Sequence, residues 1–437
     1  MAETSGLLNR RAGFTRTEGS NPSVSAILPA SQTPPASQGF PMPPISLEDV
    51  WRIIAAATTP LDCETISLNH ASGRVLSAPV IAAFEAPRFN VSMMDGYAVR
   101  EGDARVGATF VVIGTSAAGA SFGGSVGPGE AVRIFTGAAL PDGADRVVIQ
   151  EVVTAEGDQA TIIEPPGAMR FVRAQASDFA AGDEVAAAGT RLTPGALVAA
   201  AGAGASQVSV TRRPRVVTLA TGDELHAIGA SLDDLDHIPD SIGLGLGAML
   251  CGQGAELVGH HLLGDDLATL ETAAAEAVAV ADLVVVTGGA SVGARDHAKA
   301  MFVPLGMELL FSKVAIKPGK PVWLGRVGNT LVMGLPGNPG SAMVTARLLL
   351  APLVAGLLGQ RSPAALEWIT LPLAAPLPAT GDRETFVRAR LVNGKLVPLA
   401  NQDSGAQRAL AEAGWLIRCP AGQGLMNPGT VVSTLTF

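Results

Sequence analysis

The sequence predicts a multidomain protein of the α/β and β classes, built around a three-layer α/β domain. Its 437 residues exceed what a single hydrophobic core usually organises. Between residues 213 and 359, apolar runs such as VVTLAT and ADLVVVTGG alternate with helical segments predicted over 241–253 and 267–280. This alternation is typical of a mostly parallel sheet covered by helices. Short β-prone runs separated by Gly, Pro and Asp fill residues 85–171 and 360–437.

These patterns give a domain order for the whole chain. The predicted parts are a disordered tail (1–44), a discontinuous mixed N-terminal domain (45–84 plus 172–212), a β insertion domain (85–171), an α/β domain (213–359) and a C-terminal β-barrel domain (360–437). The mixed domain is expected to open with a helix capped by Ser46, whose apolar face carries Val50, Ile53 and Ile54.

Composition narrows the classes of function. A net charge of −9 and a pI of about 5.2 argue against general binding to nucleic acid or to anionic membranes. Cys63, Cys251 and Cys419 lie far apart, without the spacing of a zinc site or a disulfide framework. We therefore expect a reducing compartment.

Targeting and membrane signals also favour a location in the cytoplasm. No apolar segment follows Arg10 and Arg11, so a secretory signal is not predicted. The apolar stretch Ser341–Gly359 is interrupted by Arg347 and Pro352, which favours a buried helix over a membrane span. A cytoplasmic protein is expected.

A glycine-rich loop follows one predicted strand of the α/β domain. The segment Val284–Asp296, VVVTGGASVGARD, runs from apolar residues directly into Gly, Ser and Thr. Ligands of parallel α/β sheets lie beyond the carboxyl ends of strands, and Gly288 and Gly289 would let the backbone approach a phosphate. Asp296 at the end of the loop is a candidate ligand for Mg²⁺. The alternative is a glycine-rich turn with a surface acid.

Two further strand ends repeat this design. In TLATGDEL, Asp223 is expected to cap a helix, whereas the role of Glu224 is left open. In MGLPGNPGSA, the residues Pro336, Gly337 and Asn338 form a rigid loop before a helix that begins at Ser341. The free N–H groups of such a helix start favour an anion.

Three lysines occur close together in this acidic chain. In KVAIKPGKPVW, Lys313 and Lys317 would face the same side of an extended segment, with Lys320 nearby. A solvated surface is the common explanation for such a run, but Pro318 and Gly319 fix the backbone and favour a site. A phosphate- or nucleotide-type ligand is predicted. The domain contains neither a Walker A sequence nor a GxGxxG fingerprint, which excludes ordinary P-loop and dinucleotide sites.

The segment VSMMDGYAVR contains Tyr97, the single tyrosine of the chain, and by itself is equally consistent with a simple turn before a strand. The segment becomes more informative when it is combined with other motifs of the chain. Residues 45–437 contain an ordered series of motifs. From the N-terminal to the C-terminal side they are SMMDGYAV, RIFTGAALPDGADRVVIQE, TGDEL, TGGASVGARD, KPGKP and LPGNPGSA. As an ordered set they resemble the molybdopterin molybdenumtransferase family, which includes bacterial MoeA and the E-domain of gephyrin.

The resemblance implies an elongated, four-domain homodimer whose α/β domain holds the pterin. It implies Mg²⁺-dependent insertion of molybdate into adenylylated molybdopterin, with release of AMP. The family's active site lies between the α/β domain of one subunit and the β insertion of the other. Asp95 is therefore expected to reach the partner's site, while Met94 and Tyr97 anchor its loop by packing. The adenylyltransferase and molybdoenzyme chaperones are further expected partners.

The candidate residues follow from the matching motif positions together with the strand-end loops. The expected catalytic residues are Asp95, Thr136, Glu224, Asp296, Lys313 and Lys317, with Glu224 and Asp296 also as Mg²⁺ ligands. The expected substrate-binding residues are Asp178, Asp265, Gly288, Gly289, Ser291, Pro336, Gly337, Asn338, Arg383, Arg388 and Ser404.

Several positions depart from the family pattern. Asn90 and Val91 replace an Asp–Asn pair, Ala176 replaces a glycine, and Ile242 replaces an asparagine interpreted as a polar cap near the pocket. Two alternatives to the transferase therefore stay open. One is a divergent paralogue that acts as a molybdopterin-binding scaffold or carrier. The other is a molybdopterin adenylyltransferase, which the additional domains disfavour.

Overall fold

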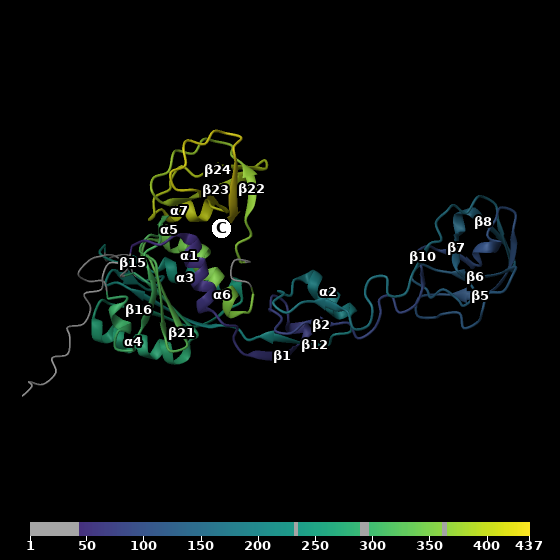
Figure 1. Cartoon of the computed structure of the whole chain (residues 1–437), viewed down its shortest axis with the longest axis horizontal. Helices are drawn as coiled ribbons and strands as arrows, with labels where there is room; N and C mark the ends of the chain where they lie inside the picture. Colours follow the sequence, from purple (N-terminus) through teal and green to yellow (C-terminus); the bar gives the residue numbers. More distant parts are fainter. Residues whose placement is uncertain (1–42, 231–234, 289–296, 361–364) are drawn as a thin grey trace, which may run out of the picture. The chain divides into compact units, whose positions relative to one another are not determined.

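The computed structural model describes residues 43–230, 235–288, 297–360 and 365–437 (Figure 1). Nearly all of the predicted tail lies outside these residues. So do Gly289, Ser291 and Asp296.

The first described helix begins where the sequence predicts. Helix α1 (Leu47–Ala57) is capped by Ser46, whose hydroxyl accepts a hydrogen bond of 3.1 Å from the N–H of Asp49. Val50 and Ile54 are fully buried on its inner face. The predicted cap and apolar face are confirmed.

The central α/β sheet has six strands. Their order is β16 (Glu256–Leu263), β13 (Arg215–Thr221), β17 (Leu283–Thr287), β21 (Thr330–Leu335), β20 (Trp323–Val327) and β18 (Glu308–Ser312). The first four strands are parallel, β20 is antiparallel to β21, and β18 is antiparallel to β20 and so runs in the direction of the first four. The mostly parallel sheet is confirmed.

Two helices flank this sheet on opposite faces (Figure 1). Helix α3 (Ser241–Gln253) packs with Val216 and Val285, whereas helix α4 (Leu267–Val280) packs with Val217 and Val284. Because neighbouring strand residues point to opposite faces, each strand contributes to both cores. The three-layer architecture and the bounds of both helices agree with the prediction.

A long apolar helix follows β21. It runs over Pro339–Leu357 as α5 (Pro339–Thr345), a π-helical turn η5 (Ala346–Leu350) and α6 (Ala351–Leu357). Within the described part of the chain it is the one helix long and apolar enough to cross a membrane, and 89% of its most apolar window is buried inside the protein. The prediction of a buried helix is confirmed, although the helix begins two residues before Ser341.

The insertion between residues 85 and 171 forms a second six-stranded sheet. Its order is β7 (Arg146–Ile149), β4 (Gly96–Val99), β6 (Glu130–Ile134), β5 (Thr109–Ser116), β9 (Gln159–Ile162) and β8 (Val153–Glu156). The short strand β3 (Val91–Ser92) pairs with β10 (Val172–Arg173) where the chain enters and leaves this part. Two separate apolar clusters are buried within it, in agreement with the predicted all-β insertion.

The segments before and after the insertion pair with each other. Strand β1 (Cys63–Ser67) pairs with β12 (Gln207–Thr211), β2 (Val80–Ile81) pairs with β11 (Glu184–Ala186), and α2 (Pro194–Gly202) follows. The short 3₁₀ turns are η1 (Leu68–His70), η2 (Glu101–Asp103), η3 (Gln150–Val152) and η4 (Ala300–Phe302), and the two-residue strands β14 (Leu225–His226) and β15 (Ile238–Pro239) pair in parallel.

The C-terminal sheet includes a strand from the lysine-rich segment. Its strands are β22 (Ile369–Pro372), β23 (Glu384–Val392), β24 (Lys395–Pro398), β25 (Trp415–Cys419) and β26 (Val431–Thr436), with helix α7 (Gln407–Glu412) beside them. A bridge between Leu373 and Leu396 joins the end of β22 to β24, so the sheet closes as a barrel. Strand β19 (Ile316–Lys317) pairs in parallel with β23. The lysine-rich segment therefore contributes to this sheet as well as to the α/β domain.

Candidate functional site

A cavity of about 810 Å³ opens at the carboxyl ends of β13, β17 and β21. Loops that follow these three strands form much of its wall, through Thr221, Gly222, Glu224, Thr287, Gly288, Pro336, Gly337, Asn338 and Pro339. The three strand-end loops therefore meet, as the sequence predicts. The volume suits a small organic ligand.

Close packing of the loops explains the glycine at position 288. Gly288 has a φ of +90°, and a Cβ there would lie 2.1 Å from the carbonyl oxygen of Thr221. A residue with a side chain would collide with this backbone and adopt a strained left-handed conformation. Gly288 therefore serves the approach of two strand-end loops to each other, in addition to lining the cavity.

Three carboxylate residues lie on the cavity wall, Glu224, Asp265 and Asp240, the last of which caps a helix. Glu224 folds back over Gly222, because a Cβ on that glycine would lie 2.5 Å from Glu224 Oε2. Asp223 points elsewhere, and its Oδ1 accepts a hydrogen bond of 2.9 Å from the N–H of Asp265. The helix-cap interpretation of Asp223 is wrong, because the short strand β14 (Leu225–His226) follows it. Asp223 instead fastens the loop that carries Asp265.

The lysine-rich segment turns instead of extending. Lys313 has a φ of +77°, its N–H donates to Val322 O at 3.0 Å, and the N–H of Val314 donates to Lys320 O at 2.9 Å. These bonds place Lys313 and Lys320 on the cavity wall. Lys317 lies in β19 and is not among the lining residues. The extended arrangement expected for Lys313 and Lys317 is wrong, since the left-handed turn breaks it. The sequence pattern did not indicate that Lys320, from the same run, lines the cavity.

The start of helix α3 forms another part of the wall, through Asp240, Ser241 and Ile242. Asp240 is the N-cap, and its Oδ1 accepts a hydrogen bond of 3.0 Å from the N–H of Gly243. The polar cap is therefore present at Asp240. The interpretation that Ile242 replaces the cap is wrong, and Ile242 packs against the apolar core beneath the helix.

The C-terminal barrel contributes Gly405 and Gln407 to the cavity. Arg388, although expected to bind substrate, is buried and donates to the carbonyl oxygens of Asn401, Asp403 and Ala406 at 3.4, 2.7 and 3.3 Å. Burial lowers the pKa of Arg388, and the nearby Asp403 partly offsets this effect. Arg388 therefore holds the loop at residues 401–406, whose Gly405 lines the cavity.

Two other expected residues of the barrel also make contacts outside the cavity wall. The carbonyl oxygen of Ser404 accepts a hydrogen bond of 2.7 Å from the N–H of Gly340, at the start of helix α5. Arg383 donates to Ile316 O at 3.3 Å, beside β19. Neither Ser404 nor Arg383 is a lining residue.

A separate polar cluster lies in the β insertion. Asp95 Oδ1 accepts hydrogen bonds from the N–H and the hydroxyl of Thr136, both at 2.8 Å. These two bonds, assisted by the charge of Arg133, hold the pKa of Asp95 below its ordinary value. The guanidinium of Arg133 lies 5.1 Å from the ring of Tyr97 and 4.9 Å from that of Phe135. Asp95 is thus a firmly oriented carboxylate on a partly exposed residue.

The two residues expected to anchor this loop behave differently. Tyr97 is half-buried and packs on an apolar cluster of the insertion, in agreement with the prediction. Met94 is 37% exposed, so the expectation that it anchors the loop by packing is wrong.

Asp178 lies in an exposed loop and is not a lining residue. Ala176 in the same loop has a φ of +56°, the left-handed region that favours glycine, where the family has one. Asn90 secures this loop, because its Oδ1 accepts a hydrogen bond of 2.9 Å from the N–H of Gln175. The departures at Asn90 and Ala176 therefore leave the loop in place, at the cost of backbone strain.

Glu224 and Asp265 place carboxylate oxygens on the cavity wall, and such hard donors suit Mg²⁺. Within the described residues, no group of three or more His, Cys, Asp or Glu side chains is placed to hold a metal ion. Mg²⁺ is commonly held by one or two carboxylates together with substrate phosphates and water, so the donor set fits a metal that arrives with its ligand.

The fold and the cavity define an α/β protein with a cavity at the carboxyl edge of its sheet, lined by lysines and carboxylates. Family comparisons match residues 45–204 to the MoeA N-terminal region (domains I and II), 217–356 to a probable molybdopterin-binding domain, and 370–437 to the MoeA C-terminal region (domain IV).

Individual relatives agree with this assignment. The molybdopterin molybdenumtransferase of Haemophilus influenzae is 39% identical over 69% of this chain and 74% of the relative. That of a Nostoc species is 31% identical over 90% and 94%. The crystal structure of a molybdopterin biosynthesis MoeA protein from Pyrococcus horikoshii superposes with a TM-score of 0.73 at 27% identity, covering 90% of this chain and 99% of that one. The chain belongs to the MoeA family.

Proposed function

We propose that this chain is a molybdopterin molybdenumtransferase, which inserts molybdate into adenylylated molybdopterin and releases AMP. The observation that carries the proposal is the cavity wall, where Lys313 and Lys320 face the same space as Glu224 and Asp265. This wall belongs to the region matched by the molybdopterin-binding family model. Cations and carboxylates together suit a pyrophosphate-containing substrate, an oxyanion and a metal.

The lysines attract the pyrophosphate and the incoming molybdate, which is a dianion. Lys317, from the same segment, is proposed to add positive charge. Glu224 and Asp296 are proposed to hold Mg²⁺, which would neutralise phosphate charge and orient the bond that is cleaved. Gly288, Pro336, Gly337 and Asn338 shape the floor of the cavity.

The Asp95 cluster is proposed to complete the site of a second copy of the chain. Asp95 is partly exposed, its carboxylate is oriented by Thr136, and it is absent from the described cavity wall, so it is available to contact another copy of the chain. In a symmetric dimer each site would then combine Asp95 of one copy with Glu224 of the other.

Mixed dimers test this arrangement. Asp95→Ala and Glu224→Gln should each abolish turnover alone. Subunit exchange between the two variants should restore about a quarter of the wild-type rate, because half of the dimers are mixed and each mixed dimer has one intact site. Full activity of Asp95→Ala, or a mixture that exchanges subunits and stays inactive, would remove Asp95 from the partner's site.

The reaction itself is tested by incubating the purified protein with adenylylated molybdopterin, Mg²⁺ and molybdate. The proposal predicts AMP release together with formation of active cofactor. An adenylyltransferase would instead form adenylylated molybdopterin from ATP, and a scaffold or carrier would bind the pterin without turnover.

A further inference from the structure

A chain of hydrogen bonds connects the central sheet to the α3 wall of the cavity. The hydroxyl oxygen of Thr218 in β13 lies 2.7 Å from His260 Nδ1 in β16, and His260 Nε2 lies 2.8 Å from Asp240 Oδ2. Asp240 Oδ1 accepts the N–H of Gly243 at 3.0 Å. Both oxygens of the capping carboxylate are thus engaged, one by the helix and one by the sheet.

This arrangement is built into the packing. Thr218 and Asp240 are 1% and 5% exposed, whereas the His260 side chain is 32% exposed. A Cβ at Gly243 would lie 2.3 Å from Asp240 Oδ2 and 2.4 Å from His260 Cε1. The helix can therefore approach the Asp240–His260 pair this closely only because residue 243 is glycine.

The pair bears directly on the cavity, because Asp240, Ser241 and Ile242 line it. A buried carboxylate that loses one of its donors carries an uncompensated acceptor and is free to rotate. Rotation of Asp240 would release the N–H of Gly243 and shift the first turn of α3. It would also change where a negative charge lies beside a cavity that takes an anion.

We propose that His260 is a positioning residue that fixes Asp240 and, through it, the α3 wall of the ligand cavity. The structural part of this proposal stands on the hydrogen bonds alone. Its kinetic part rests on the function proposed above.

Three substitutions distinguish the contributions of the two ring nitrogens of His260. His260→Gln keeps a donor near the Nε2 position and therefore the bond to Asp240. His260→Asn keeps a polar group near Nδ1, towards Thr218, and loses the bond to Asp240. His260→Leu removes both. The matched control is His261→Leu, which changes the neighbouring histidine on the opposite face of the same strand.

Hydrogen exchange of the full-length protein, followed by mass spectrometry over the first turn of α3, reports the position of the helix without any substrate. Exchange there should be about tenfold faster in the Leu and Asn variants and within about threefold of wild type in the Gln variant and in the control. Equal exchange in wild type and His260→Leu, or a Gln variant that behaves like Leu, would overturn the proposal.

Kinetics then test the link to the cavity. The KM for adenylylated molybdopterin should rise about tenfold in His260→Leu and recover in His260→Gln, with kcat changed less than about threefold throughout. An unchanged KM in His260→Leu would overturn this link. Absence of turnover in the wild-type protein would contradict the proposed function instead, and the exchange measurement would still decide the role of His260.

Discussion

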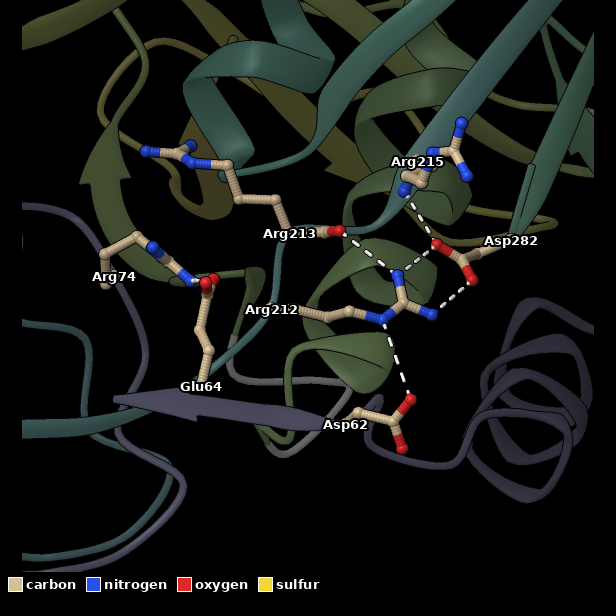
Figure 2. Close-up of polar contacts among 7 residues, drawn as sticks. All are labelled: Asp62, Glu64, Arg74, Arg212, Arg213, Arg215 and Asp282. Carbon is tan, nitrogen blue, oxygen red and sulfur yellow. Dashed lines mark hydrogen bonds and ion pairs between the residues drawn. The ribbon is translucent and has the colours of Figure 1, made fainter. Parts of the chain in front are cut away.

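Asp282 offers the sharpest test of the energetics at the start of the α/β domain (Figure 2). Its two carboxylate oxygens accept hydrogen bonds of 2.7 Å from Nη1 and Nη2 of Arg212, and Oδ2 also accepts the N–H of Arg215 at 2.8 Å. The side chain of Asp282 is 17% exposed. These bonds join Arg212 before β13 and Arg215 at the start of β13 to the residue that precedes β17, so Asp282→Asn should destabilise the fold.

The expected loss follows from the geometry. A hydrogen bond to a charged group contributes about 1.5–3 kcal/mol, and a partly buried charge left without its partner adds a further cost. Asparagine keeps one acceptor and loses the charge, so the free energy of unfolding should fall by about 2–3 kcal/mol. A second ion pair of Arg212 provides the control. Its other ion pair, to Asp62, spans 3.9 Å to a side chain that is 95% exposed. Asp62→Asn should change stability by less than about 0.5 kcal/mol.

The effect should depend on pH. Burial alone would raise the pKa of Asp282, but the hydrogen bonds from Arg212 and Arg215 and their charges lower it below the ordinary value of 3.8. A carboxylate with a lowered pKa in the folded state contributes stability above its unfolded pKa and loses it as the pH falls through the folded value. In urea denaturation, the difference in free energy of unfolding between wild type and Asp282→Asn should reach its full value at neutral pH and become smaller below pH 3.8. Equal losses for Asp62→Asn and Asp282→Asn, or a difference independent of pH, would refute this reasoning.

Three further outcomes are expected. Ala176→Gly should stabilise the protein by about 0.5–1 kcal/mol in urea denaturation, because it relieves a left-handed φ of +56° at some entropic cost, and a loss of stability would contradict this. Gly288→Ala should destabilise it by about 2–4 kcal/mol, since its Cβ would lie 2.1 Å from a carbonyl oxygen, and a neutral result would show that the loops are not packed in this way. A thiol reagent should label the exposed Cys63 and Cys251 in the native protein but not the buried Cys419, whose pKa burial raises to about 11, and rapid labelling of all three would contradict that burial.

Secondary structure was predictable from sequence because local signals fix it. Helices α3 and α4 agree with the predicted bounds, since the capping carboxylates of Asp240 and Asp266 begin them and Gly254, with a φ of +98°, ends α3. The meeting of three strand-end loops was also predictable, because parallel strands end at one edge of a sheet.

Side-chain roles were less accessible, because they depend on single backbone turns and on packing between distant segments. The left-handed φ at Lys313 decides that Lys320 lines the cavity, and no pattern in the lysine run indicates this turn. The burial of Arg388 depends on how residues 401–406 fold over it. The contact between Thr218 and His260 requires the order and register of two parallel strands.

The cavity at the carboxyl edge of the α/β sheet is proposed to hold the anionic substrate. AMP release from adenylylated molybdopterin, measured as a function of substrate and molybdate concentration, tests this proposal most directly in two lysine variants. Lys320→Ala removes a charge from the cavity wall, whereas Lys395→Ala removes an exposed lysine of β24. We expect kcat/KM to fall by about 10–100-fold in Lys320→Ala, because an anion loses a charged partner, and to stay within about twofold of wild type in Lys395→Ala. Equal activity in the two variants would contradict the proposal.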